Sequence, residues 1–308
     1  MTLSTETRFS NRLPYWLRRR IPNLSESTRV ESTIRRHRLH TVCHEALCPN
    51  RAECYAKGKV TFSIMGDICT RACRFCSVKK GIPGPPDDGE PGRLAAAVRE
   101  LGLTHVIVTS VTRDDLPDGG ASRYAAVIET LGRMDPPPVI EVLVPDFQGD
   151  GEALDAVLSA GPDIFSHNME TVKRLYGTMR RGADYERSLS ILSEAKERCK
   201  GVMTKSALIL GMGERIEEVI EVLIDLRRAD CDFIAIGQYL RPGLDQILVG
   251  EYIPPETFAW FEERAYEMGF LEATAGPLVR SSYQESRITA YRPRVVTDRV
   301  SLVRRNVL

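Results

Sequence analysis

Six short runs rich in β-branched residues alternate along this chain with five segments of helical periodicity. The runs occupy residues 60–65, 105–109, 139–144, 164–168, 203–209 and 233–237, and the helical segments occupy residues 93–101, 122–131, 152–160, 185–198 and 214–228. Strands that alternate with helices favour a parallel sheet built from right-handed βαβ units. The pattern therefore predicts an α/β fold. We expect a partial (β/α)6 TIM-like barrel, open on one side, with its chemistry in the loops at the carboxyl ends of the strands.

The segments before and after these elements lack an apolar periodic core of their own. We expect residues 1–59 to form an N-terminal extension, residues 60–268 the barrel and residues 269–308 a C-terminal extension. Both extensions are predicted to wrap on the barrel and not to fold as separate domains. Residues 81–92, which are rich in Pro and Gly, are predicted to be a loop without regular structure.

Composition places the chain among globular proteins. Of its 308 residues, 43% are hydrophobic and 27% are charged, which disfavours wholesale disorder. Its longest apolar stretches, residues 106–111 and 207–212, are far shorter than the ~20 residues that span a bilayer. The first twenty residues lack the apolar region of a secretory signal. We expect a soluble, cytoplasmic, monomeric protein that does not associate with membranes.

The net charge is zero, but the charge is unevenly distributed. Residues 1–42 hold nine Arg against three Glu, and residues 284–308 hold six Arg against Glu285 and Asp298. Basic arms on an acidic body indicate either an anionic partner, such as a nucleic acid or an acidic protein, or simply a solvated surface. The sequence has no helix-turn-helix, zinc-finger or RNA-binding signature, so we expect no nucleic-acid partner.

Six of the eight cysteines lie between residues 43 and 76. We call Cys43, Cys48 and Cys54 (C-x4-C-x5-C) the first triplet, and Cys69, Cys73 and Cys76 (C-x3-C-x2-C) the second triplet. A large chain without an export signal disfavours a disulfide framework. Neither triplet alone supplies the four paired ligands of a structural zinc site. Clustered thiolates in a reducing compartment otherwise bind iron–sulfur clusters.

The second triplet carries the more specific pattern. Three thiolates on one loop can bind three irons of a [4Fe–4S] cluster and leave the fourth iron open to S-adenosylmethionine. The spacing, with Phe75 before the last cysteine and the loop placed after the first predicted strand, resembles the signature of the radical S-adenosylmethionine (radical SAM) superfamily. In that superfamily the cluster passes one electron to the sulfonium and releases a 5′-deoxyadenosyl radical.

The first triplet admits two interpretations. Because His37, His40 and His44 surround it, a mixed Cys/His zinc site is one alternative. A second iron–sulfur cluster with a fourth ligand from elsewhere in the chain is the other, and we favour it because the two triplets are close in sequence. The isolated Cys199 and Cys231 are predicted to be small buried apolar residues.

Several further segments match one family. The two triplets together with GDICTRACRFC, TSVTRDDLPDGGA, DIFSHNMETV, IGQYLRP and GPLVRSSY resemble the lipoyl synthase family over residues 13–283, which is most of the chain. The resemblance implies an enzyme, a sulfurtransferase that inserts two sulfur atoms at carbons 6 and 8 of a protein-bound octanoyl-lysine. It also implies two [4Fe–4S] clusters and S-adenosylmethionine as cofactors.

The same resemblance implies roles for individual residues. The second triplet would bind the cluster that cleaves S-adenosylmethionine, and the first triplet an auxiliary cluster consumed as the sulfur donor. Ser282, the second serine of RSSY, would be the fourth ligand of the auxiliary cluster and would take part in catalysis by leaving as that cluster opens; Ser281 is the alternative. Four residues are candidates for binding S-adenosylmethionine: Asn168, Glu170, Gly211 and Gly213.

The implied partners are octanoylated carriers, namely the glycine cleavage H protein and the lipoyl domains of 2-oxoacid dehydrogenases, and an electron donor such as flavodoxin or ferredoxin. The basic residues 18–20 and the Arg-rich tail are expected to attract an acidic carrier. Two alternatives remain: another radical SAM enzyme with an auxiliary cluster, and a non-catalytic metal-binding interaction protein.

Overall fold

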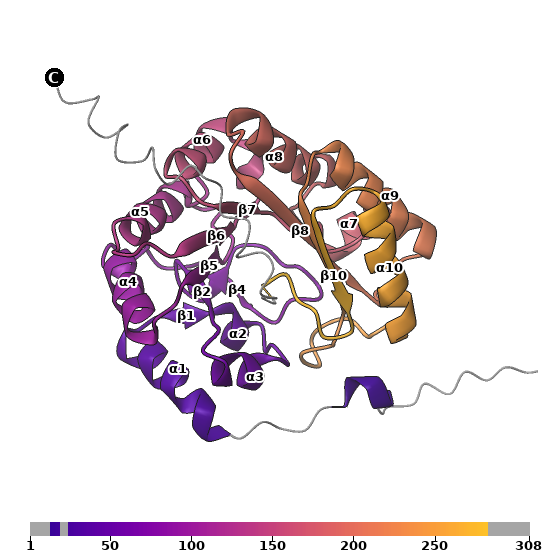
Figure 1. The fold of residues 1–308 in the computed structure, drawn as a ribbon, viewed down its shortest axis with the longest axis horizontal. Coiled ribbons are helices and arrows are strands. Elements are labelled where there is room, and N and C mark those ends of the chain that lie inside the picture. The colour runs from indigo at the N-terminus through magenta and orange to yellow at the C-terminus, as the bar shows by residue number, and fades with distance from the viewer. Residues whose placement is uncertain (1–12, 19–23, 283–308) are drawn as a thin grey trace, which may run out of the picture.

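One eight-stranded sheet organises the fold (Figure 1). The computed structural model describes residues 13–18 and 24–282. In order across the sheet the strands are β1 (His40–Thr41), β2 (Thr61–Ile64), β5 (His105–Ser110), β6 (Val139–Leu143), β7 (Ile164–Ser166), β8 (Met203–Leu210), β9 (Phe233–Gln238) and β10 (Glu272–Gly276). Every neighbouring pair is parallel except β1 and β2. Within the described residues β1 and β10 are the two edges, so the predicted partial barrel is confirmed.

Helices form an outer ring around the strands (Figure 1). Those that follow β4 are α4 (Glu90–Leu101), α5 (Ala121–Gly132), α6 (Gly151–Ser159), α7 (Lys173–Met179), α8 (Tyr185–Arg198), α9 (Ile216–Arg228) and α10 (Pro255–Glu267). All six predicted strands and all five predicted helices are present, and α7 and α10 are additional. The prediction of a loop over residues 81–92 is wrong at its end, because Pro91 occupies the first turn of α4, where its missing N–H costs nothing.

Local sequence explains these elements. The side chains of β2 and β9 are buried along their whole length, as expected of parallel strands covered on both faces. Asp150 caps α6 by accepting hydrogen bonds from Glu152 N and Ala153 N, and Asp184 caps α8 by accepting one from Arg187 N. No helix in the described ranges is both long and apolar enough to cross a bilayer.

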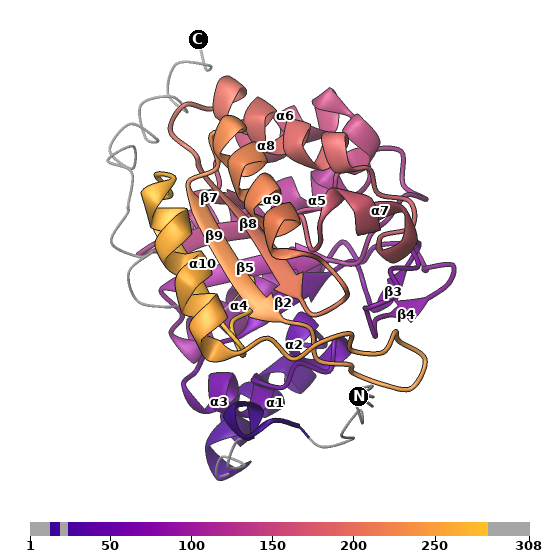
Figure 2. The same cartoon turned by 90° about the vertical axis from the view of Figure 1, so that its right-hand side faces the viewer.

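The segments predicted to be extensions take part in the sheet. The N-terminal segment forms η1 (Tyr15–Leu17), α1 (Leu24–Arg36), α2 (Val42–Glu45) and α3 (Arg51–Ala56), and supplies edge strand β1. In Figure 1 these helices lie between α4 and α10, where the barrel is open. The C-terminal segment supplies β10 at the other edge, paired with β9. A short second sheet, β3 (Ile68–Cys69) with β4 (Lys79–Lys80), flanks the loop after β2 (Figure 2).

A buried ionic network crosses the barrel interior. Lys205 Nζ lies 2.8 Å from Glu141 Oε1, and Ser166 Oγ donates to the same oxygen at 3.1 Å. His105 Nε2 lies 3.3 Å from the other carboxylate oxygen. The side chains of Glu141 and Lys205 are only 1% and 3% exposed. The network therefore ties β5, β6, β7 and β8 together, and a buried charge is tolerated because it is paired.

Candidate functional site

A cavity of about 350 Å³ opens at the carboxyl ends of the strands. Segments at the ends of β2, β5, β6, β7 and β9 line it, together with Ala207 and Ile209 of β8, helix α2 and the end of the described chain. In parallel α/β folds the carboxyl ends of the strands are where ligands bind, because the connecting loops there vary without disturbing the sheet. The volume suits a small organic ligand.

The second triplet lies in the wall formed by the loop after β2. Cys69, Cys73 and Cys76 all line the cavity, and the amide of Cys76 donates to Cys73 O at 3.3 Å. Burial raises the pKa of the Cys76 thiol to about 12 and also raises that of Cys73. Thiols in such surroundings ionise when a cation binds them. Three thiols on one loop thus fit an iron–sulfur cluster as a donor set.

The first triplet faces the same cavity from α2. Cys43, on α2, and Cys48 line the cavity, whereas Cys54, on α3, is not part of its lining. Burial raises the pKa of Cys43 to about 12 and that of Cys54 to about 11, and the neighbouring Cys48 contributes to both shifts. The three thiols therefore lie close enough to interact electrostatically. They too fit a cluster whose irons would each take one thiolate.

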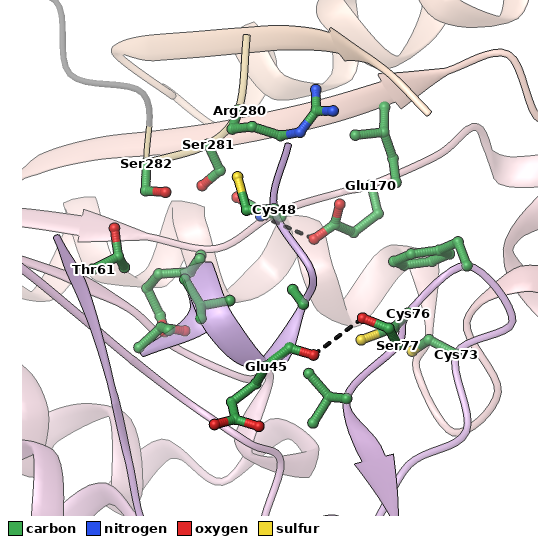
Figure 3. Close-up of a pocket in the computed structure, with 18 of the residues that line it drawn as sticks. Glu45, Cys48, Thr61, Cys73, Cys76, Ser77, Glu170, Arg280, Ser281 and Ser282 are labelled. Carbon is green, nitrogen blue, oxygen red and sulfur yellow. Dashed lines mark hydrogen bonds between the residues drawn. The ribbon is translucent and has the colours of Figure 1, made fainter. Parts of the chain in front are cut away.

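The two triplets are physically linked. Ser77, next to Cys76, donates through Oγ to the backbone oxygen of Glu45 at 3.1 Å, so the loop of the second triplet is bound to the helix of the first (Figure 3). We therefore expect any ligand between the triplets to contact both.

Ser282 reaches the cavity at the end of the described chain. Arg280, Ser281 and Ser282 belong to its lining, as does Cys48 of the first triplet (Figure 3). Asn50, at the start of α3, donates through Nδ2 to Leu278 O at 2.6 Å and fastens this segment to the first triplet's helices. The structure thus brings the RSS segment, more than two hundred residues away in sequence, to the first triplet. Tyr283 lies outside the described residues.

The histidines near the first triplet have other partners. His37 Nε2 lies 3.0 Å from Glu100 Oε2, and the Nδ1 atoms of His40 and His44 lie 3.4 and 3.3 Å from Glu45 Oε1. Among residues 13–18 and 24–282, no three His, Cys, Asp or Glu side chains are arranged around a single metal ion. Cluster thiolates each bind a different iron and need no such arrangement. The second cluster at the first triplet therefore stays a prediction.

Asn168 and Glu170 line the cavity after β7. Glu170 has φ 64°, which is uncommon for a residue with a side chain and is typical of functional sites. Its Oε1 accepts a hydrogen bond from Asn168 Nδ2 at 2.9 Å. Burial raises the pKa of Glu170, although the charge of Arg180 opposes the shift. This carboxyl therefore lies at the cavity wall, within reach of a polar ligand.

Arg180 is a site residue that the sequence interpretation missed. It lines the cavity, and its Nη1 donates to Asn168 O at 2.8 Å. Arg180 Nε and Asn168 Oδ1 are buried and have no hydrogen-bond partner among the described residues. Since buried polar groups are nearly always satisfied, these two atoms fit a polar ligand such as S-adenosylmethionine. No motif marks Arg180, because it follows the short helix α7 and reaches the cavity only through the fold.

His167 also lines the cavity but stays neutral. Burial lowers the pKa of His167 to about 4, and the charge of Arg180 contributes. Its Nδ1 lies 2.9 Å from Val144 O and its Nε2 lies 3.0 Å from Ser188 Oγ, which assigns the proton to Nδ1. Both ring nitrogens are thus engaged by the protein.

The structure places Gly211 and Gly213 in the turn after β8, outside the cavity lining. A Cβ on Gly211, which has φ 102°, would meet Gln238 Nε2 at 2.2 Å and Glu251 O at 2.4 Å. The carboxylate of Glu214 accepts hydrogen bonds from the amides of Gly211 and Met212. The glycines are needed for this tight turn, and their contact with S-adenosylmethionine stays a prediction.

Comparison with known proteins identifies the family. Residues 63–226 match the model of the radical SAM superfamily. The chain is 54% identical over 273 residues to the lipoyl synthase of Caldanaerobacter subterraneus subsp. tengcongensis, covering 88% of this chain and 95% of that protein. It is 50% identical to the lipoyl synthase of Geobacter sulfurreducens, covering 89% of each.

This chain belongs to the lipoyl synthase family. The predicted activity, a sulfur-inserting lipoyl synthase, is confirmed, as are the radical SAM class and its requirement for S-adenosylmethionine and a [4Fe–4S] cluster. The alternatives of a different radical enzyme or a non-catalytic protein are set aside.

Solved structures agree with this lipoyl synthase fold. Streptococcus suis SuiB bound to S-adenosylmethionine aligns with a TM-score of 0.55 at 12% identity, over 73% of this chain and 54% of that one. Methylornithine synthase (PylB) aligns with a TM-score of 0.52 at 14% identity, over 78% of this chain and 84% of that one. At such low identity these likenesses concern the fold alone.

Proposed function

We propose that this lipoyl synthase acts on an octanoyl group amide-linked to a lysine of a carrier protein, and inserts sulfur at carbons 6 and 8 using two clusters. The observation that carries the proposal is that thiols of both triplets and the RSS segment line one cavity. The end of an octanoyl chain that enters this cavity would lie between the first and the second triplet.

The proposed ligands follow from this arrangement. Cys69, Cys73 and Cys76 would hold the [4Fe–4S] cluster that faces S-adenosylmethionine. The auxiliary cluster would be held by the first triplet and by Ser282, whose hard oxygen is a poor iron–sulfur ligand and can therefore leave. Ser281, which lines the same cavity, is the alternative.

The chemistry itself belongs to the cofactors: one cluster supplies the electron that cleaves S-adenosylmethionine, and the auxiliary cluster supplies the sulfur. The protein contributes position and exclusion of water. Both target carbons carry unactivated C–H bonds, so no acid–base residue can replace the radical. Apolar side chains of the lining, including Val42, Leu47 and Val111, offer an aliphatic chain a surface that keeps water away.

Asn168, Glu170 and Arg180 are proposed to bind S-adenosylmethionine. The buried, unpartnered Asn168 Oδ1 and Arg180 Nε support this, since a polar ligand would satisfy both. Arg180 supplies a cation for a carboxylate, whereas Glu170 accepts hydrogen bonds from amino or hydroxyl groups. Gly211 and Gly213 are retained as candidates for backbone contacts.

The proposed carriers are the glycine cleavage H protein and the lipoyl domains of 2-oxoacid dehydrogenases, and the proposed reductant is a flavodoxin or ferredoxin. The basic residues 18–20 would attract an acidic carrier. Arg18 is exposed, while residues 19 and 20 lie outside the described part of the chain. Charge reversal at these positions should weaken carrier binding and reduce its salt dependence; affinity independent of both would refute this role.

The decisive experiment is an anaerobic assay with S-adenosylmethionine, a reductant and an octanoyl-lysine peptide, read by mass spectrometry. We expect two sulfur atoms and two 5′-deoxyadenosines per product, and about eight irons per chain. Replacing the whole first triplet by Ala should preserve 5′-deoxyadenosine formation and abolish lipoyl formation. Loss of both products would refute the proposed division between the clusters.

A further inference from the structure

A cluster of charged side chains lies next to the loop of the second triplet. Arg71, between the first two cysteines of that loop, has a side chain only 7% exposed. Its Nε and Nη2 donate to the two carboxylate oxygens of Asp114, each at 2.8 Å. Its Nη2 also donates to Asp146 Oδ1 at 2.6 Å. Arg71 thus joins the loop after β2 to the loops after β5 and β6.

Asp146 is held from its other side as well. Its side chain is fully buried, and its Oδ2 accepts a hydrogen bond from Arg187 Nε at 2.8 Å. Arg187 Nη2 donates to Gly182 O at 3.0 Å. A Cβ at Gly182 would lie 3.4 Å from Arg71 Cδ, so the segment before α8 packs against the Arg71 side chain. The chain of contacts therefore ends on the helix α8.

Backbone contacts reinforce the same attachment. Thr70 donates to Thr112 O through both N, at 3.1 Å, and Oγ1, at 3.0 Å. The amide of Asp114 donates to Thr70 Oγ1 at 3.1 Å, and the amide of Arg74 donates to Met179 O at 3.0 Å. The loop is thus fixed at the neighbouring residues Thr70 and Arg71, and again at Arg74.

The charges within this cluster balance. Burial opposes ionisation of Asp146, but hydrogen bonds and charge from Arg71, together with Arg187, lower its pKa far below the usual range. Two guanidinium groups therefore face two carboxylates. A guanidinium can bridge two carboxylates with fixed geometry, whereas an ammonium acts as a point charge.

None of the four charged side chains belongs to the cavity lining, so they act through the loop and not on a bound ligand. We propose that Arg71, Asp114, Asp146 and Arg187 are positioning residues that hold the second triplet's loop in its iron-binding conformation and so slow the loss of its cluster. The proposal rests on the proposed assignment of the second triplet as cluster ligands. Outer partners that orient metal ligands commonly change metal affinity by about 10–100-fold.

Arg113 offers a matched control. It is also a buried arginine, 1% exposed, and it pairs with Asp115 through Nη2 at 2.7 Å. Its Nη2 further donates to Gly84 O at 2.9 Å. Unlike Arg71, it does not belong to the loop of residues 69–76, and it makes no hydrogen bond to that loop. A substitution here tests the general effect of losing a buried guanidinium.

The test measures iron release from the cluster-loaded protein to a chelator, in two backgrounds. One background has the first triplet replaced by Ala and retains only the second; the other has the second triplet replaced and retains only the first. In the protein that retains only the second triplet, R71M should accelerate iron release by about 10–100-fold. R187M should accelerate it less, and R113M should match its parent. In the protein that retains only the first triplet, R71M should leave the rate of iron release unchanged.

Hydrogen exchange on the loaded protein gives a second readout. R71M should increase exchange at the amides of Thr70 and Arg74, and R113M should not. Unchanged iron release in R71M, or equal acceleration in both backgrounds, would overturn the proposal. If R71M fails to fold, unchanged release in R187M would overturn it. If the protein lacking the second triplet kept its full iron content, the ligand assignment itself would fail, independently of Arg71.

Discussion

Replacing Gly237 by Ala should separate the two activities of the enzyme. Gly237 lies in β9, and the chain segment that leads to Ser282 passes directly over it. A Cβ at this position would lie 2.0 Å from Val279 O and 3.0 Å from Val279 C. Only glycine allows this approach, and the backbone φ of Gly237 is not in the left-handed region. The effect of alanine is therefore steric.

The size of the displacement follows from these distances. Because non-bonded carbon and oxygen atoms essentially never approach within 3 Å, the segment has to retreat by about 1 Å or more. A misplacement of about 1 Å can reduce the rate of a positioned reaction by about 100-fold. The cost to the free energy of unfolding is about 1–3 kcal/mol, as for other overpacked sites.

The assay compares the two products in one reaction. G237A should form 5′-deoxyadenosine at a rate within about twofold of the parent and lipoyl-lysine about 100-fold more slowly, because only the RSS segment moves. Gly177 in α7 is the control, since a Cβ there meets nothing within 4 Å. G177A should retain both activities and gain about 1 kcal/mol of stability from helix propensity.

Two results would refute this reasoning. Undiminished lipoyl formation in G237A would mean that the position of the RSS segment is irrelevant to sulfur insertion. An equal loss of both products, in a variant whose thermal unfolding matches the parent, would mean that the segment serves the second triplet instead.

Three further predictions concern other residues. Burial opposes ionisation of Glu141, but Lys205 and His105 outweigh it and lower its pKa to about 2 from 4.5; its contribution to stability is present above pH 4.5 and is lost as the pH falls through 2. E141Q should therefore be less stable at neutral pH and flatten the stability profile between those values in denaturant titrations, and an unchanged slope would contradict this. R180M should raise the Kd for S-adenosylmethionine by roughly 5–150-fold in calorimetry, because a buried polar partner is lost; an unaltered Kd would remove Arg180 from the site. The double variant C199A/C231A should keep the iron content of the parent, since neither thiol lines the cavity, and a loss of four irons would show a wrong ligand assignment.

The buried elements could be predicted from the sequence because their patterns are local. The runs at 105–109 and 203–209 became β5 and β8 with ends shifted by one residue, since continuous burial on both faces selects β-branched residues. Strand β10 was not predicted, because Glu272–Gly276 has little apolar character and depends on pairing with β9. Local propensity alone does not specify such an edge strand.

The candidate site likewise has a part that could be predicted from the sequence and a part that could not. Cysteine spacing within residues 43–76 determined the two candidate clusters, because ligands on one short loop are constrained by the covalent chain itself. The sequence also contained RSSY, but nothing local indicates that Ser282 lines the same cavity as Cys48; that placement depends on Gly237 and on the hydrogen bond from Asn50 to Leu278. The Arg71 cluster likewise forms between loops that follow different strands, and Arg180 meets Asn168 only where the connection after β7 folds back on itself. Chain-local chemistry was thus determined by sequence, whereas contacts between distant segments were decided by the tertiary structure, because only the side-by-side pairing of parallel strands brings their carboxyl ends to one cavity.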